Sequence, residues 1–159
     1  MLCSLTRSLA VVGLLFASAA PAMAQATAEQ LDAIAKQSAE QFDMQKEVFK
    51  ESKEWLKSDK HTVGNDKVSR ADFVKLVDDL YAAGATRVYF TAIMPEGDVE
   101  KAPALMLIVG GAPAVRTKVF DTVNAFNRKL FTAAGKPELI EALKQPDAGQ
   151  PILQMQFEF

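Results

Sequence analysis

The chain has 159 residues, of which 18 are Lys or Arg and 20 are Asp or Glu, so its formal net charge is −2. This balance lacks the basic excess that marks nucleic-acid-binding proteins, and it argues against that class of function. The length suits one domain with a hydrophobic core of ordinary size.

The N-terminus predicts a secretory signal peptide over residues 1–24. Arg7 provides a positive start, residues 9–20 form an apolar run that is short for a membrane span, and Ala-Met-Ala, ending at Ala24, is a small-x-small cleavage site. We expect cleavage after Ala24, a periplasmic or secreted protein, and a single α+β domain over residues 25–159. No second apolar run of membrane length follows, so we expect no membrane span after cleavage.

Residues 27–58 predict one long amphipathic helix. Apolar residues recur along it at spacings of three and four, and charged residues fill the other side. The apolar positions are Leu31, Ile34, Phe42, Val48, Phe49, Trp55 and Leu56. We expect this stripe to pack on the protein's own core, because the mixture of acidic and basic residues argues against a cationic membrane-surface helix.

A polar loop over residues 58–68 separates this helix from a second one, predicted over residues 69–83. The second helix carries a single apolar face, formed by Phe73, Val77, Leu80 and Tyr81. Gly84 should end it, because glycine adopts a positive φ without a steric clash.

Residues 88–94 and 104–109 predict two strands, because they are rich in β-branched, aromatic and other apolar residues. Residues 95–103 form a polar connection between them. Both strands carry apolar side chains on both faces, so both should be covered on both sides.

After the turn at Gly110-Gly111, a third helix is predicted over residues 113–134 and a short one over 138–144. The chain closes with a strand, residues 152–159, in which apolar and mostly polar positions alternate. The expected inward residues are Leu153, Met155, Phe157 and Phe159.

The order α-α-β-β-α-α-β predicts an α+β fold, with a long N-terminal helix and further helices packed on a small, mainly antiparallel three-stranded sheet. The second and third helices can cover one face of this sheet. The other face needs a cover too, and either the long helix, through Phe42, Phe49 and Trp55, or a second subunit can supply it. These residues, with Tyr89 and Ile93, are therefore the candidate interaction surface. We expect the long helix to be the cover.

The stretch GNDKVSRADF, residues 64–73, resembles the second half of a calcium-binding loop. In one register Val63 would take a ligand position, and in the other Arg70 would replace the bidentate carboxylate, so neither supplies the oxygen ligands that calcium requires. We interpret Ser69 and Asp72 as the N-terminal cap of the second helix, and we expect no metal site.

Gly110, Gly111, Arg116 and Lys118 form a candidate anion site, because they surround a predicted helix start, where backbone N–H groups favour anions. Their spacing matches neither of the common phosphate-binding motifs, and Pro113 removes one donor. A simple turn between strand and helix explains the same residues.

Catalytic residue types are scarce. His61 is the only histidine, and the only cysteine, Cys3, lies in the segment that we expect to be removed. This leaves no thiolate for zinc or nucleophilic attack, and the sequence contains no G-x-S-x-G nucleophile motif. A pair of carboxylates working alone stays possible.

These observations favour an exported, non-catalytic binding or protein-interaction module, of the inhibitor or immunity type, without a cofactor. Its partner would be another protein or a second copy of the chain. Two alternatives stay open: a binder of a small apolar or anionic ligand between the sheet and the long helix, and a carboxylate-dependent hydrolase.

Overall fold

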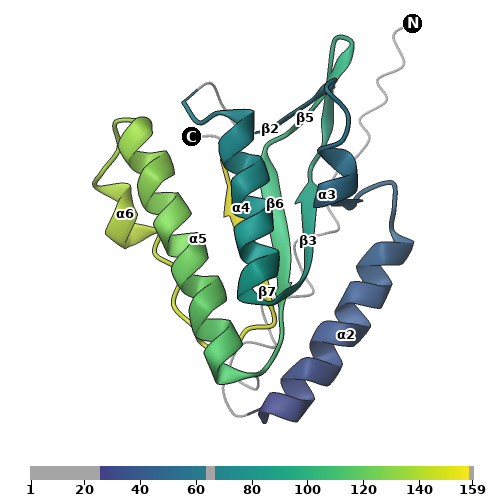
Figure 1. Ribbon diagram of the computed structural model, residues 1–159, viewed down its shortest axis with the longest axis vertical. Helices are drawn as coiled ribbons and strands as arrows, with labels where there is room; N and C mark the ends of the chain where they lie inside the picture. Colours follow the sequence, from purple (N-terminus) through teal and green to yellow (C-terminus); the bar gives the residue numbers. More distant parts are fainter. Residues whose placement is uncertain (1–25, 64–66, 158–159) are drawn as a thin grey trace, which may run out of the picture.

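The structure is a computed structural model that describes residues 26–63 and 67–157 (Figure 1). It has the α+β fold that the sequence predicts; the expected signal peptide and Phe159 lie outside the described residues. Its helices are α2 (Ala28–Met44), α3 (Ser52–Trp55), α4 (Arg70–Ala83), α5 (Pro113–Ala133) and α6 (Leu139–Ala142). Its strands are β1 (Lys50–Glu51), β2 (His61–Val63), β3 (Ala85–Thr91), β4 (Met94–Glu96), β5 (Val99–Ala102), β6 (Ala104–Val109) and β7 (Ile152–Gln156). None of the helices in this part of the chain is long and apolar enough to cross a membrane.

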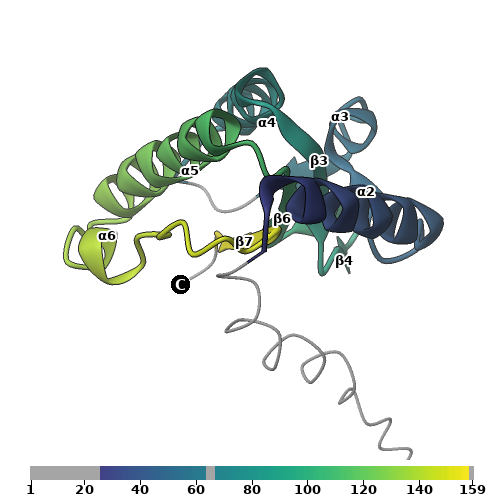
Figure 2. The same cartoon turned by 90° about the horizontal axis from the view of Figure 1, so that it is seen from below.

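The larger sheet has the strand order β1-β3-β6-β7 and is antiparallel at every pairing. Helices α4 and α5 pack on one face of it and α2 packs on the other, so the sheet is the middle of three layers (Figure 1, Figure 2). The two inner strands, β3 and β6, are therefore covered on both sides, which explains their apolar residues on both faces.

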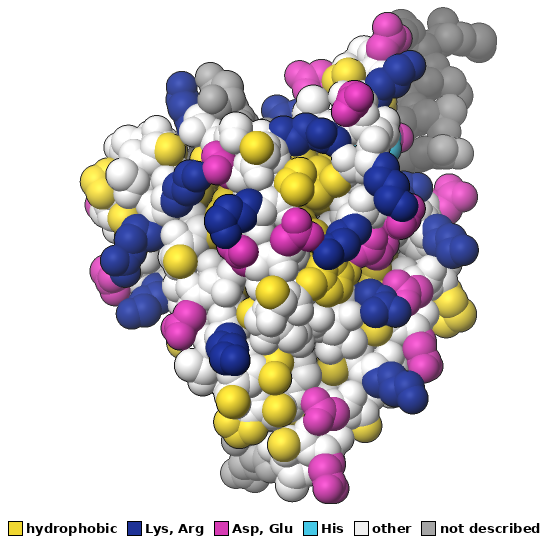
Figure 3. Space-filling view, viewed as in Figure 1, with side chains coloured by type: hydrophobic (Ala, Val, Ile, Leu, Met, Phe, Trp, Pro, Cys, Tyr) yellow, Lys and Arg dark blue, Asp and Glu magenta, His cyan; other side chains and the backbone are white. Residues whose placement is uncertain are grey.

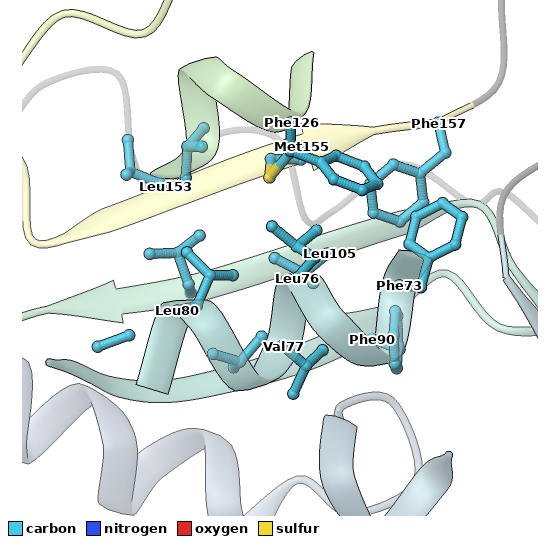
Figure 4. Packing of buried hydrophobic residues seen from close by; sticks show 14 of the residues in the cluster. Phe73, Leu76, Val77, Leu80, Phe90, Leu105, Phe126, Leu153, Met155 and Phe157 are labelled. Atoms are coloured by element: carbon cyan, nitrogen blue, oxygen red, sulfur yellow. The ribbon is translucent and has the colours of Figure 1, made fainter. Parts of the chain in front are cut away.

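The main core lies between this sheet and the layer of α4 and α5 (Figure 4). Helix α4 contributes residues at the expected spacing of three and four, namely Phe73, Leu76, Val77 and Leu80. From β7 and the residue after it, alternate side chains enter the same core, namely Leu153, Met155 and Phe157, whereas Gln154 and Gln156 are exposed. The alternation predicted for the last strand is thus confirmed as far as Phe157.

A smaller core joins α2 to the other face of the sheet. Its buried members are Ala35, Ala39 and Phe42 of α2, Tyr89 of β3, and Met106 and Ile108 of β6. Burial of each large side chain contributes about 1.5–3 kcal/mol, so this contact is a substantial part of the stability. The first helix is therefore the intramolecular cover that we expected.

The prediction of one helix over residues 27–58 is wrong. Helix α2 ends earlier, and the chain then turns, forms the edge strand β1 and enters α3. Phe42 packs in the smaller core, whereas Trp55 packs in the main core with its ring centroid 4.8 Å from that of Phe90. One straight helix cannot reach both faces of a sheet. Val48, which the periodicity placed inward, is 56% exposed in the turn.

The prediction of one three-stranded sheet is also wrong, because the structure has a four-stranded and a three-stranded sheet. Strand β1 joins the larger sheet beside β3. The expected polar connection, residues 95–103, takes part in β4 and β5, which pair antiparallel, and β2 lies parallel to β5. Every residue of β4 is exposed and β5 has one buried residue, so these strands lack the apolar alternation by which strands are recognised.

Candidate functional site

The aromatic residues predicted to form an interaction surface lie mostly inside the protein. Phe42 and Tyr89 are buried between α2 and the larger sheet, and the ring centroid of Phe49 lies 4.6 Å and 6.3 Å from theirs. Trp55 is buried in the main core, and Ile93 is half-buried and packs against that core. The same packing fills the contact between α2 and the sheet, where the alternative prediction placed a small ligand.

A buried tyrosine hydroxyl joins α2 to the larger sheet. The Tyr89 hydroxyl lies 2.6 Å from Asp43 Oδ1 and 3.1 Å from the carbonyl oxygen of Ala39. Arg87 Nε donates to the other carboxylate oxygen of Asp43 at 3.2 Å. Burial, and then the hydrogen bond to Asp43, raise the pKa of Tyr89 above its ordinary value. The hydroxyl therefore stays protonated and stabilises the contact between helix and sheet.

The one histidine of the chain, His61, lies between Trp55 and Glu100. Its ring stacks on the Trp55 indole, with centroids 4.6 Å apart and an interplanar angle of 19°. Nδ1 lies 2.6 Å from the carbonyl oxygen of Trp55, so Nδ1 must carry the hydrogen of that bond. Nε2 lies 3.4 Å from Glu100 Oε2, which also accepts from Trp55 Nε1 at 3.4 Å. The imidazole thus attaches the smaller sheet to α3.

The four residues of the candidate anion site do not surround one point. Arg116 is buried, with Nε 3.0 Å from both carboxylate oxygens of Asp147, and its other nitrogens donate to the carbonyl oxygens of Gly110 and Gln150. The hydrogen bonds from Arg116 lower the pKa of Asp147. Lys118 is exposed and lies apart, in the groove between α4 and α5.

Gly111 faces the first helix. Its N–H donates to the carboxylate of Asp32, and a Cβ at Gly111 would lie 2.1 Å from the carbonyl oxygen of Ala28. The start of α5 therefore packs directly against the first turn of α2. An acidic side chain of the same chain already accepts the N–H that the sequence assigned to an anion, and binding of a separate anion stays a prediction.

The proposed cap of α4 is present. The Ser69 hydroxyl accepts from the N–H of Asp72 at 3.3 Å, and the Asp72 carboxylate accepts from the N–H of Ser69 at 3.2 Å. Within residues 26–63 and 67–157, no group of three or more His, Cys, Asp or Glu side chains gathers as a metal site. Residues 64–66 of the calcium-like stretch lie outside the described chain.

An open groove of about 690 Å³ runs between α4 and α5 on the solvent side of the helical layer. Small and apolar side chains line it, namely Leu76, Ala82, Ala83, Thr122, Ala125 and Phe126. Charged side chains of both signs lie along it, namely Asp72, Lys75, Asp79, Lys118, Asp121 and Lys129. The face of the molecule that carries α4 and α5 shows the same interspersed charges (Figure 3).

Most of the charges in the groove are paired. Lys75 Nζ lies 2.9 Å and 2.7 Å from the carboxylate oxygens of Asp79. Lys129 bonds to Asp72, and this bond, together with those from Ser69, lowers the pKa of Asp72. The side chains of the two remaining charged residues, Lys118 and Asp121 of α5, form no ion pair or hydrogen bond with the described residues.

Sequence reasoning missed this groove, because its two walls lie in helices that four strands separate along the chain. The available signal was weak. It consisted of alanines, such as Ala82 and Ala125, on the solvent side of two amphipathic helices.

Comparison of the chain with protein-family models, with curated proteins and with solved structures finds no match.

Proposed function

We propose that the chain is an exported, non-catalytic protein-interaction module that binds its partner through the groove between α4 and α5. The N-terminal segment supports the first part, with Arg7, the apolar run over residues 9–20 and the Ala-Met-Ala sequence before residue 25.

The groove is the observation that carries the proposal. Small-molecule sites enclose most of their ligand, whereas this groove is open along its length and suits a ridge of side chains from another protein. Ala82 and Ala125 leave room for a partner backbone to approach closely. Leu76 and Phe126 belong to the main core, so the groove is preformed and loses little conformational entropy on binding.

The charges support binding rather than catalysis. Lys75 is paired with Asp79, and Lys129 is paired with Asp72, so these side chains neutralise one another at the surface. Catalytic acids and bases instead have a pKa shifted toward the working pH, whereas the pKa of Asp72 moves further below it. A groove edged by charges of both signs favours one orientation of a bound partner that also carries charges of both signs.

Site-specific crosslinking in cells that export the protein tests this proposal. A photoreactive residue at Ala125, in the groove, should yield an adduct of higher mass. The same residue at Lys36, exposed on α2, should yield none and is the matched control. If neither position, or both equally, gives an adduct, the groove is not the binding surface.

A further inference from the structure

We infer that the partner is a second copy of this chain, which docks through an antiparallel contact between the α5 helices of the two molecules. This inference rests on the proposed use of the groove and adds the identity of the partner. It begins with Lys118 and Asp121, whose exposed side chains have no ion-pair partner among the described residues.

Lys118 and Asp121 do not pair with each other, although they lie three residues apart on one helix. The same spacing gives the ion pairs Glu54–Lys57, at 2.7 Å, and Glu141–Lys144, at 3.9 Å. In both pairs the acidic residue comes first and the lysine lies just beyond the end of a short helix. The lysine also comes first in Lys75–Asp79 of α4, which does pair at a spacing of four, so the order alone does not decide pairing. The side chains of Lys118 and Asp121, unpaired within the described chain, are therefore the ones available to a partner.

A twofold axis between Lys118 and Asp121 makes the two charges complementary. Helices related by such an axis run antiparallel, and every contact occurs twice. Each Lys118 then lies at the level of Asp121 in the second copy, and the long lysine side chain can reach that carboxylate. Two equivalent ion pairs form across the contact.

The same axis brings small residues together. Ala114, Lys118, Asp121 and Ala125 are all exposed and follow one another at spacings of four, three and four, so they form one stripe along α5. The spacing is symmetric about its centre, so Ala125 of one copy faces Ala114 of the other. Alanines at these positions let the two helices approach closely.

The charge of the whole groove is compatible with this contact. Its charged residues are three lysines and three aspartates, so two copies of the same surface meet without net repulsion. Each α5 then lies over the groove of the other copy, and the two helical layers stack as a four-helix arrangement.

Sedimentation velocity of the purified exported protein tests the inference. We expect a monomer–dimer equilibrium that weakens as salt is added, because exposed ion pairs are screened. Lys118→Asp and Asp121→Lys should each weaken self-association at least about tenfold, because both place like charges opposite each other. Lys36→Asp makes the same charge change on α2 and should leave the equilibrium unchanged.

A mixture of the two single variants gives the sharpest result. The stripe of one variant is acidic and that of the other is basic, so an equimolar mixture should form a heterodimer at concentrations where each variant alone self-associates only weakly. The double variant Lys118→Asp/Asp121→Lys should self-associate like the original chain. Circular dichroism of each variant shows whether the fold is retained.

A monomeric original chain at every concentration, or no heterodimer in the mixture, would overturn the inference. The crosslinking experiment separates this failure from failure of the proposed function. An adduct from Ala125 with the mass of one chain plus a different protein would keep the groove as a binding surface but exclude the second copy. Absence of any adduct would exclude both.

Discussion

Arg116 and Asp147 form an ion pair that joins the first turns of α5 to the segment before β7. The guanidinium is buried, and its Nε lies 3.0 Å from both oxygens of the carboxylate. Asn124, two turns further along α5, exchanges hydrogen bonds of 3.0 Å and 2.8 Å with the backbone of Gln145 in the same segment. Side chains of α5 therefore position the chain as it returns to the sheet.

The substitution Asp147→Asn should destabilise the protein at neutral pH and lose this effect in acid. The pKa of Asp147 is lowered in the folded protein, so the stabilisation by the ionised carboxylate is fully present above its unfolded value near 3.8. This stabilisation is lost as the pH falls through the lower folded pKa. Urea unfolding of both proteins from neutral pH to about pH 2 should show two stability curves that converge below 3.8. A constant separation at all pH values would mean that the charge of the Asp147 carboxylate is not the source of the stabilisation.

The substitution Phe42→Ala should lower the free energy of unfolding by about 3–5 kcal/mol, because it leaves a cavity between α2 and the sheet. Val48, six residues later, is 56% exposed, and Val48→Ala should change stability by less than about 0.5 kcal/mol. Chemical denaturation measures both values. A cost of Phe42→Ala as small as that of Val48→Ala would show that α2 does not cover the sheet.

The elements that sequence patterns predicted well are those whose apolar residues serve a single core. Among the described residues, the apolar positions predicted to point inward in α4, α5 and the last strand pack in or against the main core, so one periodicity persists along each element. Residues 45–58 differ, because Phe49 contributes to one face of the sheet and Trp55 to the other. Their apolar spacing continues the helical pattern by coincidence across a turn and a short strand.

The candidate site was less accessible to sequence reasoning, because its chemistry depends on which groups are already paired. Arg116 resembled a free anion ligand in the sequence, and only the fold brings Asp147 to it. Lys118, two residues later, was assigned to the same anion site, yet it lies in the groove between α4 and α5. Only the structure shows which cation is paired with a residue distant in sequence, as Arg116 is, and which is available to a partner, as Lys118 is.

We expect the protein to be exported and its mature chain to begin at Gln25. The Ala-Met-Ala sequence that ends at Ala24 motivates this prediction, since small residues at the first and third positions before the cut are what signal peptidases require. Intact-mass spectrometry of the protein recovered from the periplasm or the medium checks it, allowing for cyclisation of the terminal glutamine. A recovered chain that still begins at Met1 would contradict both the cleavage and the export on which the proposed function depends.

The substitution Gly111→Ala should disturb a part of the protein that is remote in sequence, the first turn of α2. A Cβ there would lie 2.1 Å from the carbonyl oxygen of Ala28, and backbone atoms must move to accept it. We expect a cost of about 1–3 kcal/mol and faster hydrogen exchange at residues 28–35, because the start of α2 is pushed away from α5.

Gly135 is the matched control, since a Cβ there meets no atom within 4 Å and only its φ of +69° opposes the change. Gly135→Ala should cost about 1–2 kcal/mol and leave exchange in α2 unchanged. Equal exchange at residues 28–35 in the two variants would refute the direct packing of α5 on α2.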